Sequence, residues 1–208
     1  MTWLPNNLDR VGIAFLEHLY LLVVPIVIAF FISMVLGVYS AKKPKLYALI
    51  MIVTGILFAV PSLALFALLI PFFGIGTTPA IIGLTAYSLM IMIRNIATGF
   101  QSLPPEVIDA AHGMGYGRWR RIYEIELPLA LPFIIAGLRI ASVTVIGIAT
   151  VAAYINAGGL GAIIFEGIDQ RYPEKILVGG ALTAIMALAV DYVLSRVERR
   201  LRRTVVVD

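Results

Sequence analysis

The sequence predicts an all-α integral membrane protein with about five transmembrane helices, and three observations lead to this fold class. First, 61% of the 208 residues are hydrophobic and 13% are charged, whereas a soluble domain has about 45–50% apolar and about 25% charged residues. Second, several apolar stretches approach the roughly 20 residues that a helix needs to cross a bilayer core. Third, these stretches lack the alternation of membrane β-strands, so helices must satisfy their backbone hydrogen bonds in lipid. A soluble enzyme, a disordered chain and, with no cysteine present, a disulfide scaffold are excluded.

The expected spans are five apolar stretches, at residues 19–39, 46–70, 79–93, 133–155 and 176–194. Before them, apolar residues at helical spacing predict that residues 1–18 contain a lead-in helix at the outer interface. Pro61 lies inside the second span, where a proline either kinks the helix into a hinge or gate or is merely tolerated. Since no stretch has the composition of a soluble domain, residues 1–208 are expected to form a single transmembrane domain.

The basic residues are distributed unevenly along the chain and predict its orientation. A net charge of +4 is too small for a nucleic-acid-binding protein of this hydrophobicity, so no nucleic-acid partner is expected. Twelve of the 16 Lys and Arg residues fall in three segments that lie on one predicted side of the membrane, at 42–45, 94–121 and the tail 195–208. By the positive-inside rule these segments are cytoplasmic, which places the N-terminus outside and the C-terminus in the cytoplasm.

One long polar segment, residues 95–128, interrupts the apolar composition on the predicted cytoplasmic side. A short helix is expected over residues 107–114, and Gly115 after it can adopt the positive φ of a sharp turn. A second short amphipathic helix is expected over residues 119–127, ended by Pro128. Such a pair of short helices has a shape that fits a groove of another protein. The alternative is an ordinary interfacial loop anchored by basic residues.

The same segment carries a recognisable motif. Asp109-Ala110-Ala111, followed by Gly115 and then by Ile125-Glu126-Leu127-Pro128, resembles the cytoplasmic EAA signature of ABC importer permeases. Asp109 stands where that signature has Glu, which keeps the carboxylate and shortens its reach. Further stretches, together covering most of residues 55–180, resemble the permeases for glycine betaine, carnitine, choline and related osmoprotectants. These stretches are Pro61-Ser-Leu-Ala-Leu, Pro71-Phe-Phe-Gly-Ile-Gly-Thr, Tyr87-Ser-Leu, Gly113-Met-Gly, Ile125-Glu-Leu-Pro-Leu-Ala-Leu-Pro132 and Gly158-Gly-Leu-Gly161.

This resemblance implies the type I ABC importer permease fold in a multi-pass protein of a prokaryotic cytoplasmic (inner) membrane. It implies ATP-driven uptake of an osmoprotectant by alternating access, with ATP and Mg bound by separate cytoplasmic ATPase subunits. The sequence agrees, because it contains no phosphate-binding loop of the Gly-x-x-x-x-Gly-Lys-Ser/Thr type. The chain is therefore expected to be no enzyme and to hold no cofactor or metal. The other implied partners are a second permease, identical or similar, and an extracellular or periplasmic solute-binding protein.

Two groups of candidate site residues follow. The resemblance implies that the coupling residues, which would contact the ATPase, are Asp109, Ala110, Ala111, Gly115, Arg118, Arg120, Arg121, Ile125, Leu127 and Pro128. The three arginines are expected to pair with acids on the ATPase or with anionic lipid headgroups, and at least one of them with membrane lipid. Residues within the spans that are polar, aromatic or hinge-forming are candidates for the translocation path, and these are Pro61, Ser62, Tyr87, Ser88, Arg139, Ser142 and Tyr154.

Two of these path candidates carry alternatives. Arg139 is a lone charge within a span and must face protein or water. It is expected either to form a structural pair or reach the interface, or to lie near the path. Tyr87 could hold a quaternary ammonium by a cation–π interaction or serve as an anchor or packing residue. Asp191, near the end of the last span, is expected to cap or pair there.

Three other functions are alternatives to an osmoprotectant permease. A permease for methionine-like amino acids or for another betaine-like solute would share the five spans and the coupling motif. A membrane scaffold without transport is an alternative from another class. An intramembrane enzyme would need a nucleophile with a base, or a metal cluster. The two histidines, His18 and His112, are predicted on opposite sides of the membrane, which argues against an enzyme.

Overall fold

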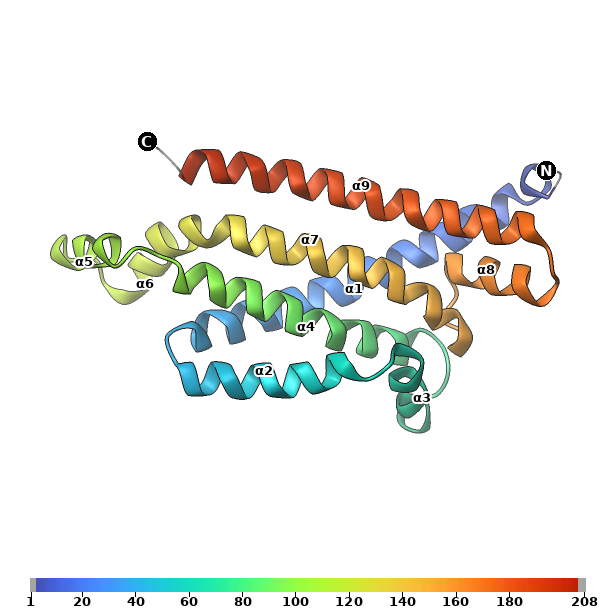
Figure 1. Ribbon diagram of the computed structural model, residues 1–208, viewed down its shortest axis with the longest axis horizontal. Coiled ribbons are helices and arrows are strands. Elements are labelled where there is room, and N and C mark those ends of the chain that lie inside the picture. Colours follow the sequence, from blue (N-terminus) through green and yellow to red (C-terminus); the bar gives the residue numbers. More distant parts are fainter. Residues whose placement is uncertain (1–2, 206–208) are drawn as a thin grey trace.

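The computed structural model describes residues 3–205, with side chains described for residues 3–202, and these form an elongated helical bundle (Figure 1). The helices are α1 Leu8–Ala41, α2 Pro44–Ala59, α3 Ser62–Phe73, α4 Thr77–Gln101, α5 Pro105–Gly113, α6 Arg118–Arg121, α7 Leu127–Val151, α8 Leu160–Asp169 and α9 Pro173–Val205. Short 3-10 turns lie at Leu4–Asn6 and Ala152–Ile155, and a π-helical turn lies at Ile122–Glu126. No strand occurs within this described range, so the predicted all-α fold is confirmed.

Helix α4 packs against both α1 and α7, and α9 packs along α7 on the outside of the bundle (Figure 1). The close packing depends on glycines. A Cβ on Gly37 of α1 would lie 2.7 Å from Cγ2 of Ile96 on α4, and a Cβ on Gly137 of α7 would lie 2.7 Å from Cβ of Asn95. Small residues let membrane helices approach closely in this way. Close packing matters here because the hydrophobic effect does not drive helices together in lipid.

The start of α1 differs from the predicted N-terminal lead-in helix. It runs for 34 residues from Leu8 through Pro25 without a break, so no separate lead-in helix precedes the first span. Val11, Ala14 and His18 are already buried against the rest of the bundle. Because this packing continues along the whole helix, the first residues of α1 are held in line with the span. At 1.5 Å per residue α1 is about 51 Å long, well beyond the bilayer core.

The second expected span is broken rather than continuous. Helices α2 and α3 meet at an angle of 96°. Val60 is extended, as a residue before proline prefers, and Pro61 is the N-cap of α3. The prediction of one helix over residues 46–70 is therefore wrong, and the proline effect is larger than a kink. Four helices of the described chain are long and apolar enough to cross a membrane, and the bent pair makes a fifth if it counts as one span.

The polar segment is shorter than predicted, because helices enter it from both sides. Helix α4 continues to Gln101, so residues 95–101 belong to the span rather than to the coupling segment. Pro128 does not end the second short helix: α6 passes through the π-helical turn directly into α7. The N–H of Leu127 bonds to the carbonyl of Ile122, five residues back. Pro128 then lies in the first turn of α7, where its missing N–H costs little.

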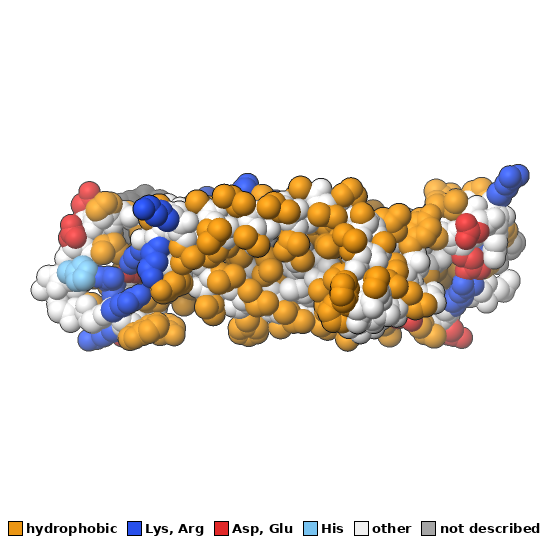
Figure 2. Space-filling view, turned by 90° about the horizontal axis from the view of Figure 1, so that it is seen from below, with side chains coloured by type: hydrophobic (Ala, Val, Ile, Leu, Met, Phe, Trp, Pro, Cys, Tyr) orange, Lys and Arg blue, Asp and Glu red, His pale blue; other side chains and the backbone are white. Residues whose placement is uncertain are grey.

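Charged side chains gather at the two ends of the bundle, and the surface between them is apolar (Figure 2). One end holds the α1–α2 turn, α5, α6 and the end of α9, and is called the hairpin end below. The other holds the start of α1, α8 and the start of α9, and is called the α8 end. The described N-terminal and C-terminal segments lie at opposite ends (Figure 1). The assignment of one end to the cytoplasm stays a prediction.

Candidate functional site

At the hairpin end, α5 and α6 form a compact turn around Gly115. Gly115 has a φ of +77°, as predicted. The N–H of Tyr116 donates to the carbonyl of Ala111 at 3.0 Å, and the N–H of Met114 donates to Ala110 at 3.0 Å. These bonds satisfy carbonyls at the end of α5 and reverse the chain direction. Ala111 is fully buried beneath the turn, whereas Asp109 and Ala110 are exposed.

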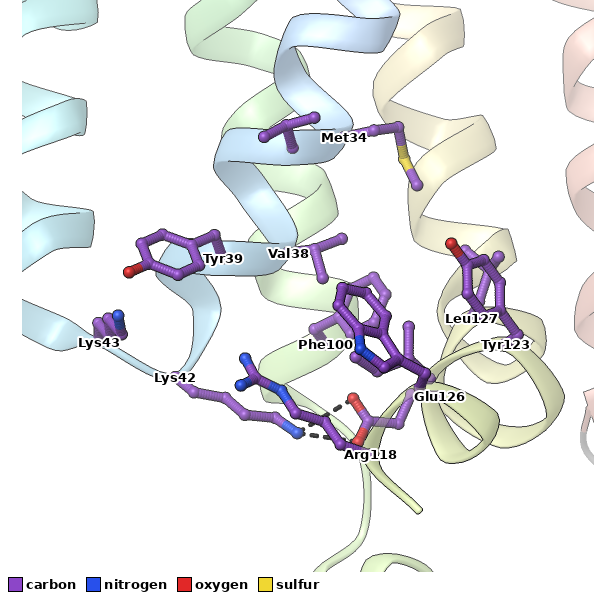
Figure 3. Close-up of a pocket in the computed structure, with 13 residues that line it drawn as sticks. Met34, Val38, Tyr39, Lys42, Lys43, Phe100, Arg118, Tyr123, Glu126 and Leu127 are labelled. Carbon is purple, nitrogen blue, oxygen red and sulfur yellow. Dashed lines mark hydrogen bonds and ion pairs between the residues drawn. The ribbon is translucent and has the colours of Figure 1, made fainter. Parts of the chain in front are cut away.

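A buried carboxylate, Glu126, ties this hairpin to the bundle. Its side chain is 1% exposed and accepts hydrogen bonds from Nζ of Lys42 at 2.8 and 3.1 Å (Figure 3). It also accepts a hydrogen bond of 2.7 Å from Nε of Arg121, and a terminal nitrogen of that guanidinium contacts the His112 ring. Four parts of the chain meet here: the α1–α2 turn, α5, α6 and the π-helical turn. Arg121 is itself nearly buried, so Glu126 neutralises a charge that would otherwise be costly.

Glu126 was not among the predicted site residues. A signal for it exists in the sequence, because an acid between Ile125 and Leu127, two residues before Pro128, stands in an apolar context that predicts burial. The pairing with Lys42, 84 residues earlier, has no signal in a single sequence.

The three arginines of the coupling segment have separate environments. Arg121 is buried on Glu126. Arg120 is exposed, pairs with Glu124 at 3.0 Å and lies 4.6 Å from the centre of the Tyr116 ring. Arg118 lines a pocket between α1 and the π-helical turn (Figure 3). The other coupling candidates divide as well: Ile125 and Leu127 are half-buried, and Pro128 is exposed.

An exposed apolar surface accompanies these charges. Trp119 and Tyr123 stack with ring centres 6.4 Å apart and are 68% and 64% exposed. Met114, at the tip of the turn, is also largely exposed. Large exposed aromatic and methionine side chains at a charged end of the molecule are typical of interaction surfaces.

The translocation-path candidates do not form one cluster. Tyr87 is buried, donates its hydroxyl to the carbonyl of Val60 and packs edge-on against Phe58. It therefore braces the break between α2 and α3, next to exposed Pro61 and half-buried Ser62.

The remaining polar and aromatic path candidates, Ser88, Ser142 and Tyr154, have other surroundings. Ser88 is fully buried and donates to the carbonyl of Leu84 at 2.8 Å. Ser142 is buried on α7, where it lines an apolar groove shared with α1 and α9. Tyr154 is exposed at the α8 end and packs on Phe165.

Arg139 forms the structural pair that was one of its two predicted roles. Its Nε donates to Asp191 at 2.6 Å, and a terminal nitrogen donates to Glu198 at 3.1 Å, both on α9. Asp191 pairs as expected. Glu198 was not predicted, and it also pairs with Arg202 one turn on. These ion pairs join α7 to α9 at the edge of the apolar surface.

The α8 end has its own ionic cluster. Glu166 pairs with Lys175 at 2.6 Å and with Arg10, and these hydrogen bonds lower the pKa of the Glu166 carboxyl to about 2. The N–H of Gly159 donates to the Glu17 carboxylate at 2.8 Å. A Cβ on Gly161 would overlap the carbonyl oxygen of Thr150, so this glycine permits close approach of α8 to the end of α7. The described side chains contain no cluster of three or more His, Asp or Glu that could hold a metal ion.

A bundle of long apolar helices with a short helical hairpin at one charged end has the architecture of a multi-span membrane protein. Residues 33–203 match the model of the family described as "Binding-protein-dependent transport system inner membrane component", and the chain belongs to this family. The fold agrees. It is similar to a chain in the inward-facing MetNI methionine ABC transporter, with a TM-score of 0.81 and 23% identity, covering 92% of this chain and 95% of that one. The expected type I ABC importer permease fold is thus confirmed.

Among curated relatives, the carnitine transport permease protein OpuCB of Listeria monocytogenes is 35% identical over 97% of this chain and 92% of its own length. The glycine betaine/carnitine/choline transport system permease protein OpuCB of Bacillus subtilis is 36% identical over 96% and 92%. The osmoprotectant import permease protein OsmW of Salmonella typhimurium is 35% identical over 88% and 87%. These proteins are permease components, and the match extends over nearly their whole length.

Proposed function

We propose that this chain is the membrane-spanning subunit of an ATP-driven importer for osmoprotectants of the glycine betaine, choline and carnitine type. The support is the near full-length similarity to permeases that carry these solutes in their names. The likeness to the methionine transporter lies below 25% identity, so it supports the fold and not the solute. ATP hydrolysis belongs to a separate subunit, since the sequence has no phosphate-binding loop.

The hairpin of α5 and α6 is the part that couples the permease to the ATPase. One observation carries this proposal: a rigidly tethered hairpin displays exposed residues beyond the apolar surface. Gly115 folds the hairpin, and Glu126 clamps it to α1 and α7. Its exposed Asp109, Ala110 and Met114 then form a surface that fits a groove on a protein.

The hairpin end is cytoplasmic in this proposal. The support is the accumulation of Lys and Arg in the α1–α2 turn, the hairpin and the end of α9, as the positive-inside rule requires. The α8 end is then extracellular or periplasmic, where its charged helix is available to a solute-binding protein. The membrane is the cytoplasmic membrane of a prokaryote.

A second permease, identical or similar, completes the path. The exposed apolar side chains of α2 and α3, among them Phe72 and Ile56, supply a face that needs lipid or another subunit to cover it. The break at Pro61, braced by Tyr87, is the proposed gate-forming feature of that region.

The solute is tested by uptake into vesicles that contain the permease, its ATPase and its binding protein. Labelled glycine betaine, choline, carnitine and methionine are compared with and without ATP. Saturable, ATP-dependent uptake of at least one of the quaternary ammonium solutes is expected. Saturable uptake of methionine without uptake of those solutes would overturn the solute assignment and leave the permease assignment intact. No ATP-dependent uptake of any solute, with the complex assembled, would favour a scaffold.

The coupling role is tested by Gly115→Asp, with Gly113→Asp as the matched control. An L-residue at a φ of +77° costs about 1 kcal/mol or more, although a Cβ would have open space there. Gly113 is equally open and has an ordinary helical φ. We expect Gly115→Asp to remain in the membrane but to lose ATP-driven uptake, whereas Gly113→Asp keeps most of it. Normal uptake by Gly115→Asp would contradict the assignment.

A further inference from the structure

A pocket of about 390 Å³ lies between the end of α1 and the stretch from α6 to the start of α7. Its walls change character along the bundle axis (Figure 3). Met34, Val35 and Val38 line the part nearer the middle of the molecule, and Lys42, Lys43 and Arg118 line the part at the hairpin end. The pocket is therefore apolar on one side and cationic on the other.

The position of this pocket is at the boundary of the apolar surface. Val35 is 70% exposed on α1, within the stretch that is apolar enough to cross a membrane. Trp119 and Tyr123 from the hairpin also line the pocket. Tryptophan and tyrosine are enriched where acyl chains meet headgroups, because their rings are amphipathic. The pocket thus opens to hydrocarbon and to the headgroup layer at once.

Two of the three cations are not neutralised by the protein. Lys42 is held by Glu126, as described above. Lys43 lies with Nζ 3.7 Å from the centre of the Tyr39 ring, and it forms no ion pair with any described carboxylate. The same holds for Arg118 within the described side chains, and its guanidinium lies near the Lys42 side chain (Figure 3). A guanidinium and an ammonium in this arrangement suit a phosphodiester.

We propose that this pocket binds one anionic phospholipid. The phosphodiester binds at the Arg118 guanidinium, Lys43 adds a second positive charge to the lining of the same pocket, and an acyl chain runs along Val35 and Val38 toward the middle of the membrane. The apolar wall favours a lipid over an acidic segment of a cytoplasmic protein, because such a segment would gain nothing from contact with the exposed Val35 inside the membrane span. This inference depends on the membrane location of the family, and it holds whichever solute is transported.

The two tryptophans of the chain allow a direct test. Trp119 lines the pocket, and Trp3 lies at the opposite end next to Lys175. In the full-length Trp3→Phe chain, fluorescence therefore reports on the pocket alone. This chain is reconstituted in phosphatidylcholine vesicles that contain increasing fractions of lipid with brominated acyl chains, which quench tryptophan on contact. Quenching by brominated phosphatidylglycerol is compared with quenching by brominated phosphatidylcholine at equal fractions.

Saturable quenching with a preference for phosphatidylglycerol is expected. Each basic residue near an anionic headgroup strengthens the interaction about fivefold, so the preference should reach at least about fivefold. Adding Lys43→Gln and Arg118→Gln should reduce it below about twofold, since both free cations are then lost. The control, Lys45→Gln with Arg94→Gln, removes the same two charges from exposed sites outside the pocket and should keep the preference. Unchanged helical circular dichroism of both double variants verifies their folding.

Other outcomes would overturn the proposal. Equal quenching by the two lipids would mean that the pocket does not select an anionic headgroup. Equal loss of preference in the pocket variant and the control would assign it to overall charge. Abolition of the preference by millimolar inorganic phosphate would assign the pocket to a soluble anion. Abolition on addition of the ATPase subunits would assign the pocket to that protein in the assembled transporter.

Discussion

The two ends of the bundle each hold a glutamate between two basic side chains, but they bury it to different extents. Glu126 at the hairpin end is 1% exposed and receives Lys42 and Arg121. Glu166 at the α8 end is 24% exposed and receives Lys175 and Arg10. Both clusters join segments far apart in the chain. The difference lies in the carboxylate: Glu126 and Arg121 are both buried, so loss of either leaves the other uncompensated, whereas water reaches Glu166 and Arg10 at the α8 end and only Lys175 is buried there.

The largest expected effect is that of Glu126→Gln. It leaves Arg121 buried without its counter-charge, which costs about 3–5 kcal/mol of stability. We expect a marked drop in the thermal midpoint of the purified protein in detergent, measured by circular dichroism, and loss of ATP-driven uptake. A midpoint within a degree of the parent would show that the cluster contributes nothing to holding the hairpin.

The next effect tests the α8 end by packing rather than charge. Gly161→Ala forces a Cβ into the carbonyl of Thr150, and overpacking of this kind costs about 1–3 kcal/mol. The control is Gly147→Ala on the neighbouring part of α7, where a Cβ meets nothing within 4 Å. A lower midpoint for the first variant and an unchanged one for the second are expected. Equal midpoints would mean that α8 adjusts its position freely.

A pH series on Glu166→Gln tests the contribution of the ionic cluster at the α8 end. The pKa of Glu166 is lowered by Lys175 and Arg10 from 4.5 to about 2 in the folded protein. The ionised carboxylate therefore stabilises the fold fully above its unfolded pKa, and this contribution disappears as the pH falls toward 2. We expect the parent to be more stable than the variant at pH 7 and the difference to shrink steadily below pH 4.5. A difference that is the same at pH 7 and pH 3 would contradict this linkage.

The smallest effect is expected for Glu124→Gln, two residues before Glu126. Its pair with Arg120 is exposed on both sides, and surface pairs one helical turn apart contribute about 0.3–0.5 kcal/mol. The thermal midpoint should change by little more than the error of the measurement. The same substitution at two glutamates of one helical segment thus isolates burial as the variable. A loss as large as that of Glu126→Gln would remove this contrast.

Much of the fold follows from the sequence for local reasons. Apolar runs of suitable length predicted the helices around α1, α4, α7 and α9, and Gly115 predicted the turn after α5. Helix ends were predicted less well. Pro61 breaks a helix completely and Pro128 breaks none, because the neighbouring residues decide the result: Val60 extends freely, while the π-helical turn before Leu127 rearranges the hydrogen bonds.

The candidate site was predicted in part. The polar segment, its turn at Gly115 and a capping or pairing role for Asp191 were predicted from residue types and spacing, whereas the coupling role of the segment is implied by the family resemblance. Glu126 and Glu198 were not predicted, and neither was Arg139 as the partner of Asp191, because each of these contacts joins residues more than fifty positions apart. A single sequence specifies which side chains are charged, but the packing of α1 against α4 and of α9 against α7 decides which of them meet.

The π-helical turn has a mechanical consequence. Because it joins α6 to α7 without a loop, residues Arg118–Ile155 form one rod of 38 residues, roughly 55 Å long at the usual helical rise. The far end of this rod holds the carbonyl of Ile155, which accepts a hydrogen bond of 2.6 Å from Gly76 at the start of α4. A tilt of roughly 5° at the hairpin would displace that end by roughly 5 Å over a rod of this length. A small rotation of the hairpin end would therefore move the opposite end of the rod by a distance comparable to the width of a small solute.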